Sequence, residues 1–113
     1  MNYFENETKC KCGCGYDINP AFLTLINKIR EDYGKPITIS SGARCKNYNT
    51  KIKGAKYSMH MLGYAVDFVR TDELLKFILA NLTKYDIYIE DPKVTTTWIH
   101  IDTKKRPNRI FIP

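Results

Sequence analysis

Residues 58–69 of the chain are SMHMLGYAVDFV, a short stretch containing His60 that leads into an alternating apolar pattern. The alternation predicts a β-strand over residues 63–69. The side chains expected to face the core are Tyr64, Val66 and Phe68. Asp67 then points to the opposite face, where its neighbours along the strand are small and leave space beside it. His60 lies in the turn before the strand, so it can fold back toward Asp67.

A second strand, predicted over residues 97–102 (TWIHID), has the same alternation. Its core-facing residues are Ile99 and Ile101. The residues expected on its opposite face are Trp98, His100 and Asp102. If the two strands are neighbours, His60, Asp67 and His100 converge. Two imidazoles and one carboxylate form a three-ligand zinc site with an open position for a water, whose pKa the metal lowers.

Two longer helices are predicted from their capping residues and apolar stripes. Asn19 followed by Pro20 is typical of a helix start, and Gly34 ends that helix. The apolar stripe of this helix is Phe22, Leu25, Ile26, Ile29 and Tyr33. Thr71 can cap the next helix. Its expected buried face is Leu74, Leu75, Ile78, Leu79 and Leu82.

The remaining elements complete one small domain. A short helix is predicted over residues 45–52. Further strands are predicted over residues 37–40, 86–90 and 109–112. Helices followed by closely spaced strands favour an α+β fold with a mainly antiparallel sheet and flanking helices. We therefore expect a single domain over residues 1–113, with an irregular, cysteine-rich segment at 1–18.

Composition limits the classes of protein. The chain has 113 residues, enough for one domain. Its 18 Lys and Arg against 12 Asp and Glu give a net charge of +6, which suggests an anionic partner: nucleic acid, a membrane surface or an anionic polymer. The apolar runs are too short for a transmembrane helix, and the first 20 residues lack the apolar region of a secretory signal. We expect synthesis in the cytoplasm.

Four cysteines allow several interpretations. Cys10, Cys12 and Cys14 lie in the sequence CKCGCG, and Cys45 lies much further along the chain. Four thiols can remain reduced, form disulfides or bind a metal. The C-x-C-x-C spacing differs from the usual C-x2-C zinc knuckle, and disulfide connectivity does not follow from sequence.

The combined pattern resembles a known family. Ser58-x-His60-x-x-Gly63-x-Ala65-x-Asp67, followed by Trp98-Ile-His100-Ile-Asp102, is similar to the zinc D-alanyl-D-alanine carboxypeptidases. These are peptidoglycan peptidases of bacteria and phages, and they share their zinc domain with Hedgehog signalling domains. The resemblance extends upstream, through ISSGARC at 39–45, Asn49 and Gly54-Ala55, to CKCGCG at 10–15. The resemblance covers roughly residues 4–105, and within the family the chain is similar to one compact branch.

The resemblance implies a Hedgehog/DD-peptidase-like fold and a zinc-dependent peptidase. Its substrates would be peptidoglycan stem or cross-link peptides, cut as a D,D-carboxypeptidase or an endolysin-like endopeptidase. One zinc ion would be held by His60, Asp67 and His100. Arg44 would hold a substrate carboxylate, to which a guanidinium is geometrically matched. Ser58 would orient His60 or bond the substrate.

The sequence does not identify which residue acts as the general base. Several family members have a carboxylate three residues before the last histidine, where this chain has Thr97. The nearby carboxylates are Glu90, Asp91 and Asp102. Asp102 shares a strand face with His100, so it can instead orient that imidazole. If no base exists, the domain is a zinc-stabilised binding module without activity.

A nucleic-acid binder is a third hypothesis, suggested by the charge. The basic residues are spread along the chain, and no nucleic-acid motif is present. We therefore expect no nucleic-acid partner, and expect the charge to favour approach to an anionic cell wall. We also expect a monomer that acts on the wall after phage-type release or as part of a virion.

Overall fold

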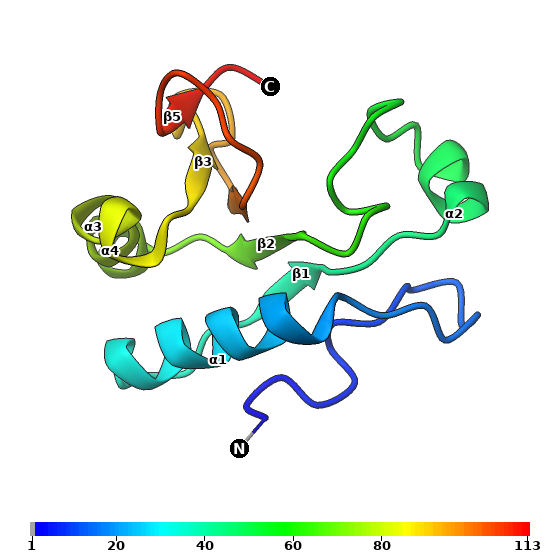
Figure 1. Cartoon of the computed structure of the whole chain (residues 1–113), viewed down its shortest axis with the longest axis horizontal. Helices are drawn as coiled ribbons and strands as arrows, with labels where there is room; N and C mark the ends of the chain where they lie inside the picture. The colour runs from blue at the N-terminus through cyan, green and yellow to red at the C-terminus, as the bar shows by residue number, and fades with distance from the viewer. Residues whose placement is uncertain (1) are drawn as a thin grey trace.

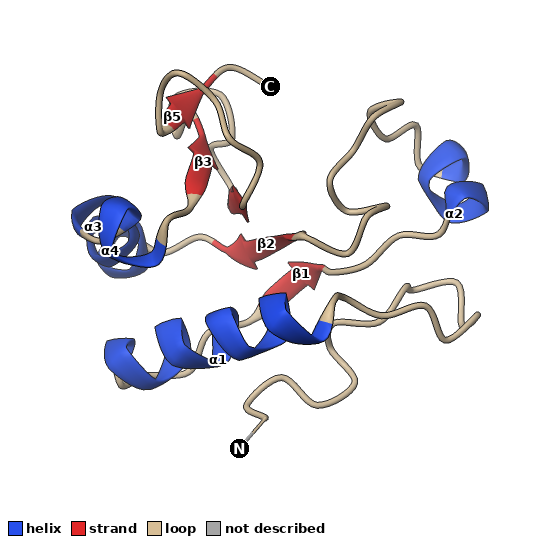
Figure 2. Ribbon diagram, in the orientation of Figure 1, coloured by secondary structure: helices blue, strands red, loops and turns tan. Residues whose placement is uncertain are grey.

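Five strands form one mixed sheet in the computed structural model, which describes residues 2–113 (Figure 1, Figure 2). The strands are β1 (Ile39–Ser41), β2 (Ala65–Val69), β3 (Tyr88–Glu90), β4 (Trp98–Asp102) and β5 (Ile110–Phe111). Their order in the sheet is β1-β2-β4-β3-β5, with antiparallel pairs except for the parallel pair β3–β5. The expected α+β domain with a mainly antiparallel sheet is confirmed.

The helices are α1 (Pro20–Tyr33), α2 (Lys46–Lys51), α3 (Asp72–Ala80) and α4 (Leu82–Tyr85). Asn19 caps α1 through a hydrogen bond from the Ala21 amide, and Gly34 ends it in the left-handed conformation, as predicted. Thr71 caps α3 by accepting a hydrogen bond from the amide of Leu74. In the described chain, no helix is both long enough and apolar enough to cross a membrane.

One part of the predicted helix face is wrong. Leu79 is 38 % exposed, whereas Leu74 and Ile78 are almost completely buried. Leu74 and Ile78 are four residues apart and share a face, but Leu79 lies about 100° further around the helix. The helix also stops at Ala80, so Leu82 is buried from the separate short helix α4.

The hydrophobic core covers one face of the sheet. It joins residues of α1 and α3 to the apolar side chains of the strands. The strand residues in this core are Ile39, Val66, Phe68, Ile89, Ile99 and Ile101. Asp67, His100 and Asp102 are buried on the opposite face, because successive side chains in a strand alternate. The alternation predicted for β2 and β4 is therefore confirmed, with Tyr64 partly buried just before β2.

The N-terminal segment has no helix or strand between residues 2 and 18, yet it is anchored. Phe4 is fully buried in the core, and the carbonyl of Thr8 accepts a hydrogen bond from the amide of Ala43 at 2.8 Å. Gly42 permits this approach, because a Cβ at that position would lie 2.3 Å from the Thr8 carbonyl oxygen. The segment therefore supports the connection between β1 and α2.

Candidate metal centre

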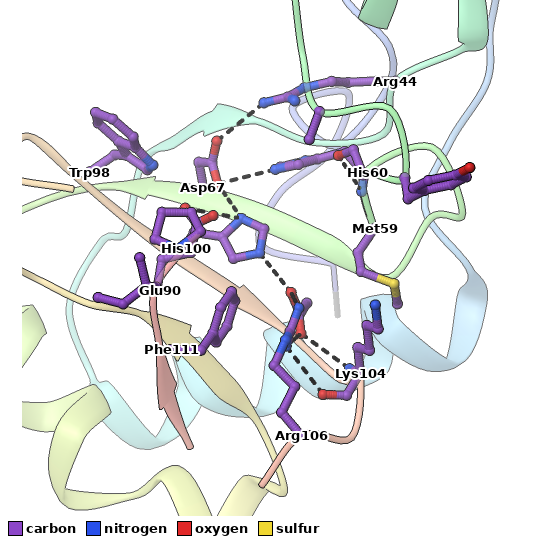
Figure 3. Close-up of a pocket in the computed structure, with 16 residues that line it drawn as sticks. Arg44, Met59, His60, Asp67, Glu90, Trp98, His100, Lys104, Arg106 and Phe111 are labelled. Carbon is purple, nitrogen blue, oxygen red and sulfur yellow. Dashed lines mark hydrogen bonds and ion pairs between the residues drawn. The ribbon is translucent and has the colours of Figure 1, made fainter. Parts of the chain in front are cut away.

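The pairing of β2 with β4 brings the three candidate ligands together. Asp67 lies directly opposite His100 in the antiparallel register. Asp67 Oδ1 is 2.9 Å from His100 Nδ1 and 3.1 Å from His60 Nε2 (Figure 3). One ligand atom from each residue lies within 4.8 Å of the others, and all three side chains are buried. The predicted convergence of these side chains is present in the structure.

In each imidazole, the ring nitrogen that points away from Asp67 donates a hydrogen bond to another acceptor. His60 Nδ1 lies 2.7 Å from the carbonyl oxygen of Gly42, to which it donates, so Nε2 faces Asp67. His100 Nε2 donates to Asp102 Oδ2 at 2.7 Å, so Nδ1 faces Asp67. Metal-binding histidines characteristically donate their second ring nitrogen to a carbonyl or a carboxylate in this way. Both rings are thus oriented with one nitrogen toward a common point.

Electrostatics at the cluster favour a cation. Burial alone would raise the pKa of the Asp67 carboxyl, but hydrogen bonds from His100 and His60 hold it well below its ordinary value. Burial opposes the charged form of His100, yet hydrogen bonds with Asp102 and Asp67 raise the pKa of its imidazole to about 9. The ionised carboxylates of Asp67 and Asp102 therefore lie on either side of the His100 imidazole, and their negative charge favours a cation there.

The donor set suits a catalytic zinc ion. Two imidazole nitrogens and one carboxylate oxygen are the ligand types of catalytic zinc sites, which keep one position open. The cluster opens into a cavity of about 410 Å³. Its basic lining residues are Arg44, Lys104 and Arg106, and its aromatic ones are Tyr57, Trp98 and Phe111. A substrate can therefore reach the side of the cluster on which no protein ligand lies.

Asp102 borders the cavity, but its carboxylate is engaged by His100 and Arg106. Its two carboxylate oxygens accept hydrogen bonds from the Arg106 guanidinium at 2.7 and 3.1 Å, and its side chain is 1 % exposed. The Arg106 guanidinium also lies over the ring of Phe111, 3.5 Å from its centroid. The orienting role considered for Asp102 fits this geometry. Sequence reasoning missed Arg106, whose spacing of four residues from Asp102 was the available signal.

Glu90 is a predicted carboxylate that faces the candidate metal ligands. It ends β3, lines the cavity, and places Oε1 3.9 Å from His100 Nδ1. Asp91 lies outside the cavity lining and accepts a hydrogen bond from the amide of Lys93. Thr97 also lies outside the lining, so it offers no group to the site.

Arg44 is held beside the cluster by several partners. Its Nε donates to Ser41 Oγ at 3.1 Å, Nη1 to Asn49 Oδ1 at 3.4 Å, and Nη2 to Asp67 Oδ2 at 3.4 Å. Asn49 is itself fixed by a hydrogen bond to the Ala55 carbonyl. The Arg44 side chain remains 14 % exposed at the cavity wall. Residues of the segment from Ser41 to Ala55 therefore hold the Arg44 guanidinium in place through hydrogen bonds.

Two further predicted residues border the cavity. Ser58 Oγ accepts a hydrogen bond from the backbone amide of His60 at 3.2 Å, which fixes the turn that carries the imidazole. Trp98 lies at the edge of the cavity and is 37 % exposed (Figure 3). Ser58 thus contacts the backbone of a candidate ligand, and Trp98 forms part of the cavity wall.

Comparison with known families assigns the chain. The family model described as Peptidase M15 matches residues 2–102, which include all three candidate ligands. The chain belongs to this family, that of the zinc D-alanyl-D-alanine carboxypeptidases, and is thereby placed among the metallopeptidases. No curated protein sequence matches the chain.

Proposed function

We propose that the chain is a single zinc peptidase domain, over residues 1–113, that hydrolyses peptidoglycan stem or cross-link peptides. His60, Asp67 and His100 bind one zinc ion. The observation that carries this proposal is the convergence of their ligand atoms at an open cavity, with both outer ring nitrogens already paired. Membership in the M15 family supports the same class of reaction.

One basic side chain of the cavity, that of Arg44, suits an anionic peptide end. Arg44 lies next to Asp67 and presents its guanidinium at the cavity wall. A guanidinium binds a carboxylate through two parallel hydrogen bonds. We infer that Arg44 binds the C-terminal carboxylate of a stem peptide, as D,D-carboxypeptidase activity requires. An endopeptidase would place a side-chain or internal carboxylate there.

Hydrolysis needs a base as well as a Lewis acid. A bound zinc ion would polarise the scissile carbonyl and lower the pKa of a water. Glu90 lies 3.9 Å from His100 and faces the same space. Glu90 takes the proton of the attacking water on its carboxylate and returns it to the leaving amine nitrogen. Asp102 holds His100 in place throughout, and Arg44 positions the substrate.

The setting of the reaction is part of the proposal. The net charge of +6 favours approach to anionic wall polymers. We infer that the protein acts as a monomer on the cell wall, after phage-type release or as a component of a virion. The inactive alternative, a zinc-stabilised binding module of the same fold, is favoured by one observation only, the threonine at position 97.

The test is mass spectrometry of the products formed from purified peptidoglycan. Zinc-loaded protein is expected to release defined fragments of the stem or cross-link peptides, and chelation or His60→Ala is expected to abolish them. Lys76→Ala, at an exposed position of α3, is the matched control and should retain activity. Intact peptides after incubation with zinc-loaded protein would instead establish the binding module.

A further inference from the structure

A second cluster of metal-binding side chains lies apart from the cavity. It consists of Cys10, Cys12, Cys14 and Cys45, whose four sulfur atoms lie within 4.8 Å of one another. Cys12 Sγ is 3.4 Å from Cys10 Sγ and 3.6 Å from Cys45 Sγ. None of the four lines the cavity that contains His60. The cluster therefore needs an explanation of its own.

The sulfur spacing matches a tetrahedral metal site. With zinc–sulfur bonds of about 2.3 Å, the edges of a tetrahedron of four thiolates measure roughly 3.8 Å. The distances from Cys12 Sγ to Cys10 Sγ and to Cys45 Sγ, 3.4 and 3.6 Å, lie close to this value, and all four sulfurs lie within 4.8 Å of one another. A disulfide would instead draw one pair of sulfurs to about 2.05 Å and separate it from the other two. All four cysteines are free in the structure.

The backbone around the cluster is shaped to gather the sulfurs. Gly13 and Gly15 both have positive φ, 85° and 89°, which reverses the chain between Cys12 and Tyr16. The amide of Cys10 donates to the carbonyl of Tyr16 at 2.8 Å and closes the loop.

Two backbone amides point at the sulfurs. The amide of Cys45 donates to Cys10 Sγ, and the amide of Tyr48 donates to Cys45 Sγ, each at 3.4 Å. Hydrogen bonds to the ligand atoms of a metal site orient the ligands and favour their anionic form. Basic residues flank the cluster in sequence, at Lys9, Lys11 and Lys46, and partly offset the charge of four thiolates.

Apart from the cysteines, the loop is tied to the domain by a hydrogen bond from Tyr16 Oη to the carbonyl of Met61 at 2.6 Å. Residues 11–16 are all exposed, so little apolar surface fixes them to the domain. Cys45 follows Arg44 directly and caps α2, on the side of the molecule where the N-terminal loop runs (Figure 1). A link between the loop and Cys45 would therefore also anchor the segment that carries Arg44.

We propose that the four cysteines bind a second zinc ion in a closed structural site that ties the N-terminal loop to the start of α2. Four thiolates complete the tetrahedral coordination of zinc, which leaves no position for a substrate. Binding exchanges four S–H bonds for four Zn–S bonds and releases four protons, with no change of oxidation state. The site shares no ligand with the proposed catalytic zinc, so the two sites can be tested separately.

Cobalt substitution tests the proposal on the intact chain. Reduced, metal-free protein is titrated with Co²⁺ while the near-ultraviolet spectrum is recorded. The thiolate cluster is expected to give an intense sulfur-to-cobalt charge-transfer band, which a site made of His60, Asp67 and His100 cannot give because it lacks sulfur. Absence of that band from the wild-type protein would overturn the proposal, even if no cysteine variant folds.

Zinc stoichiometry separates the two sites. We expect two zinc ions per wild-type chain, one in His60→Ala with the cobalt band retained, and one in Cys12→Ser with the band lost. One zinc per wild-type chain and none in His60→Ala would overturn the second site while leaving the catalytic one. Intact-mass detection of disulfides in protein isolated under reducing conditions, or an iron–sulfur chromophore, would also overturn it.

Discussion

Asp67 uses its two carboxylate oxygens for different neighbours. Oδ1 faces both imidazoles, and Oδ2 faces the Arg44 guanidinium at 3.4 Å. Asp67 and His100 could be placed on the correct faces from sequence because alternation along a strand is a local property. The pairing of Arg106 with Asp102 was missed, because Arg106 lies in a loop and its spacing of four residues indicates a contact reliably only within a helix.

Replacing Glu90 tests the assignment of the base. Glu90→Gln keeps the size of the side chain but cannot accept the proton of the attacking water. We expect kcat to fall by roughly 10²- to 10⁴-fold while zinc content stays unchanged. Asp91→Asn is the matched control, since Asp91 lies outside the cavity and should retain full activity. Wild-type kcat in Glu90→Gln would exclude Glu90 as the base.

Replacing Arg44 tests the substrate contact. Arg44→Ala removes the guanidinium at the cavity wall but none of the three proposed zinc ligands. We expect kcat/KM for stem peptides to fall roughly 10- to 100-fold, the loss of charge-assisted hydrogen bonds, with one catalytic zinc retained. Lys51→Ala, on the exposed end of α2, is the control. An unchanged kcat/KM in Arg44→Ala would refute the contact.

At the scale of elements, the C-terminal strand differs from a simple hairpin. β5 pairs in parallel with β3, and this pairing carries Phe111 to the cavity, where Arg106 lies over its ring. The strand was predicted from its apolar residues, but its partner was not, because pairing depends on tertiary contacts. The division of the predicted second helix into α3 and α4 was missed for the same reason.

A hydrogen bond between helices gives a pH-dependent prediction. Tyr85 Oη of α4 donates to Asp32 Oδ2 of α1 at 2.6 Å, and this bond, with Lys28, holds the pKa of Asp32 below its ordinary value. A carboxyl with a lowered pKa stabilises the fold above its unfolded pKa, and this stability is lost as the pH falls through the folded pKa. Tyr85→Phe should therefore lower the melting temperature at pH 7.

Thermal melts of the wild-type protein and of Tyr85→Phe between pH 7 and pH 3 test the role of this hydrogen bond. The difference between wild type and Tyr85→Phe is expected to be largest near neutral pH. It should narrow below about pH 4, the ordinary pKa of an aspartate, where the unfolded chain takes up the proton first, and vanish as the pH falls through the lowered pKa of Asp32 in the folded protein. Thr83→Ala, also on α4, serves as the control. A difference that stays constant across the range would show that the bond does not act through the ionised carboxylate.

At the scale of the whole molecule, the two faces of the sheet have different roles. One face packs against the helices to form the core, and the other carries the candidate metal centre and its cavity. The fold and the three candidate ligands followed from hydrophobic patterning and motif spacing. The arrangement of the cysteines did not, because it depends on how the N-terminal loop returns to Cys45 in space.

The most direct test of the account is a zinc titration of metal-free protein in which occupancy and hydrolysis of a defined stem peptide are measured on the same samples. We predict that the rate rises in proportion to zinc bound by His60, Asp67 and His100, and that Asp67→Asn, with this site lost, stays inactive at every zinc concentration. Full hydrolysis by the metal-free protein, or by Asp67→Asn, would contradict the account.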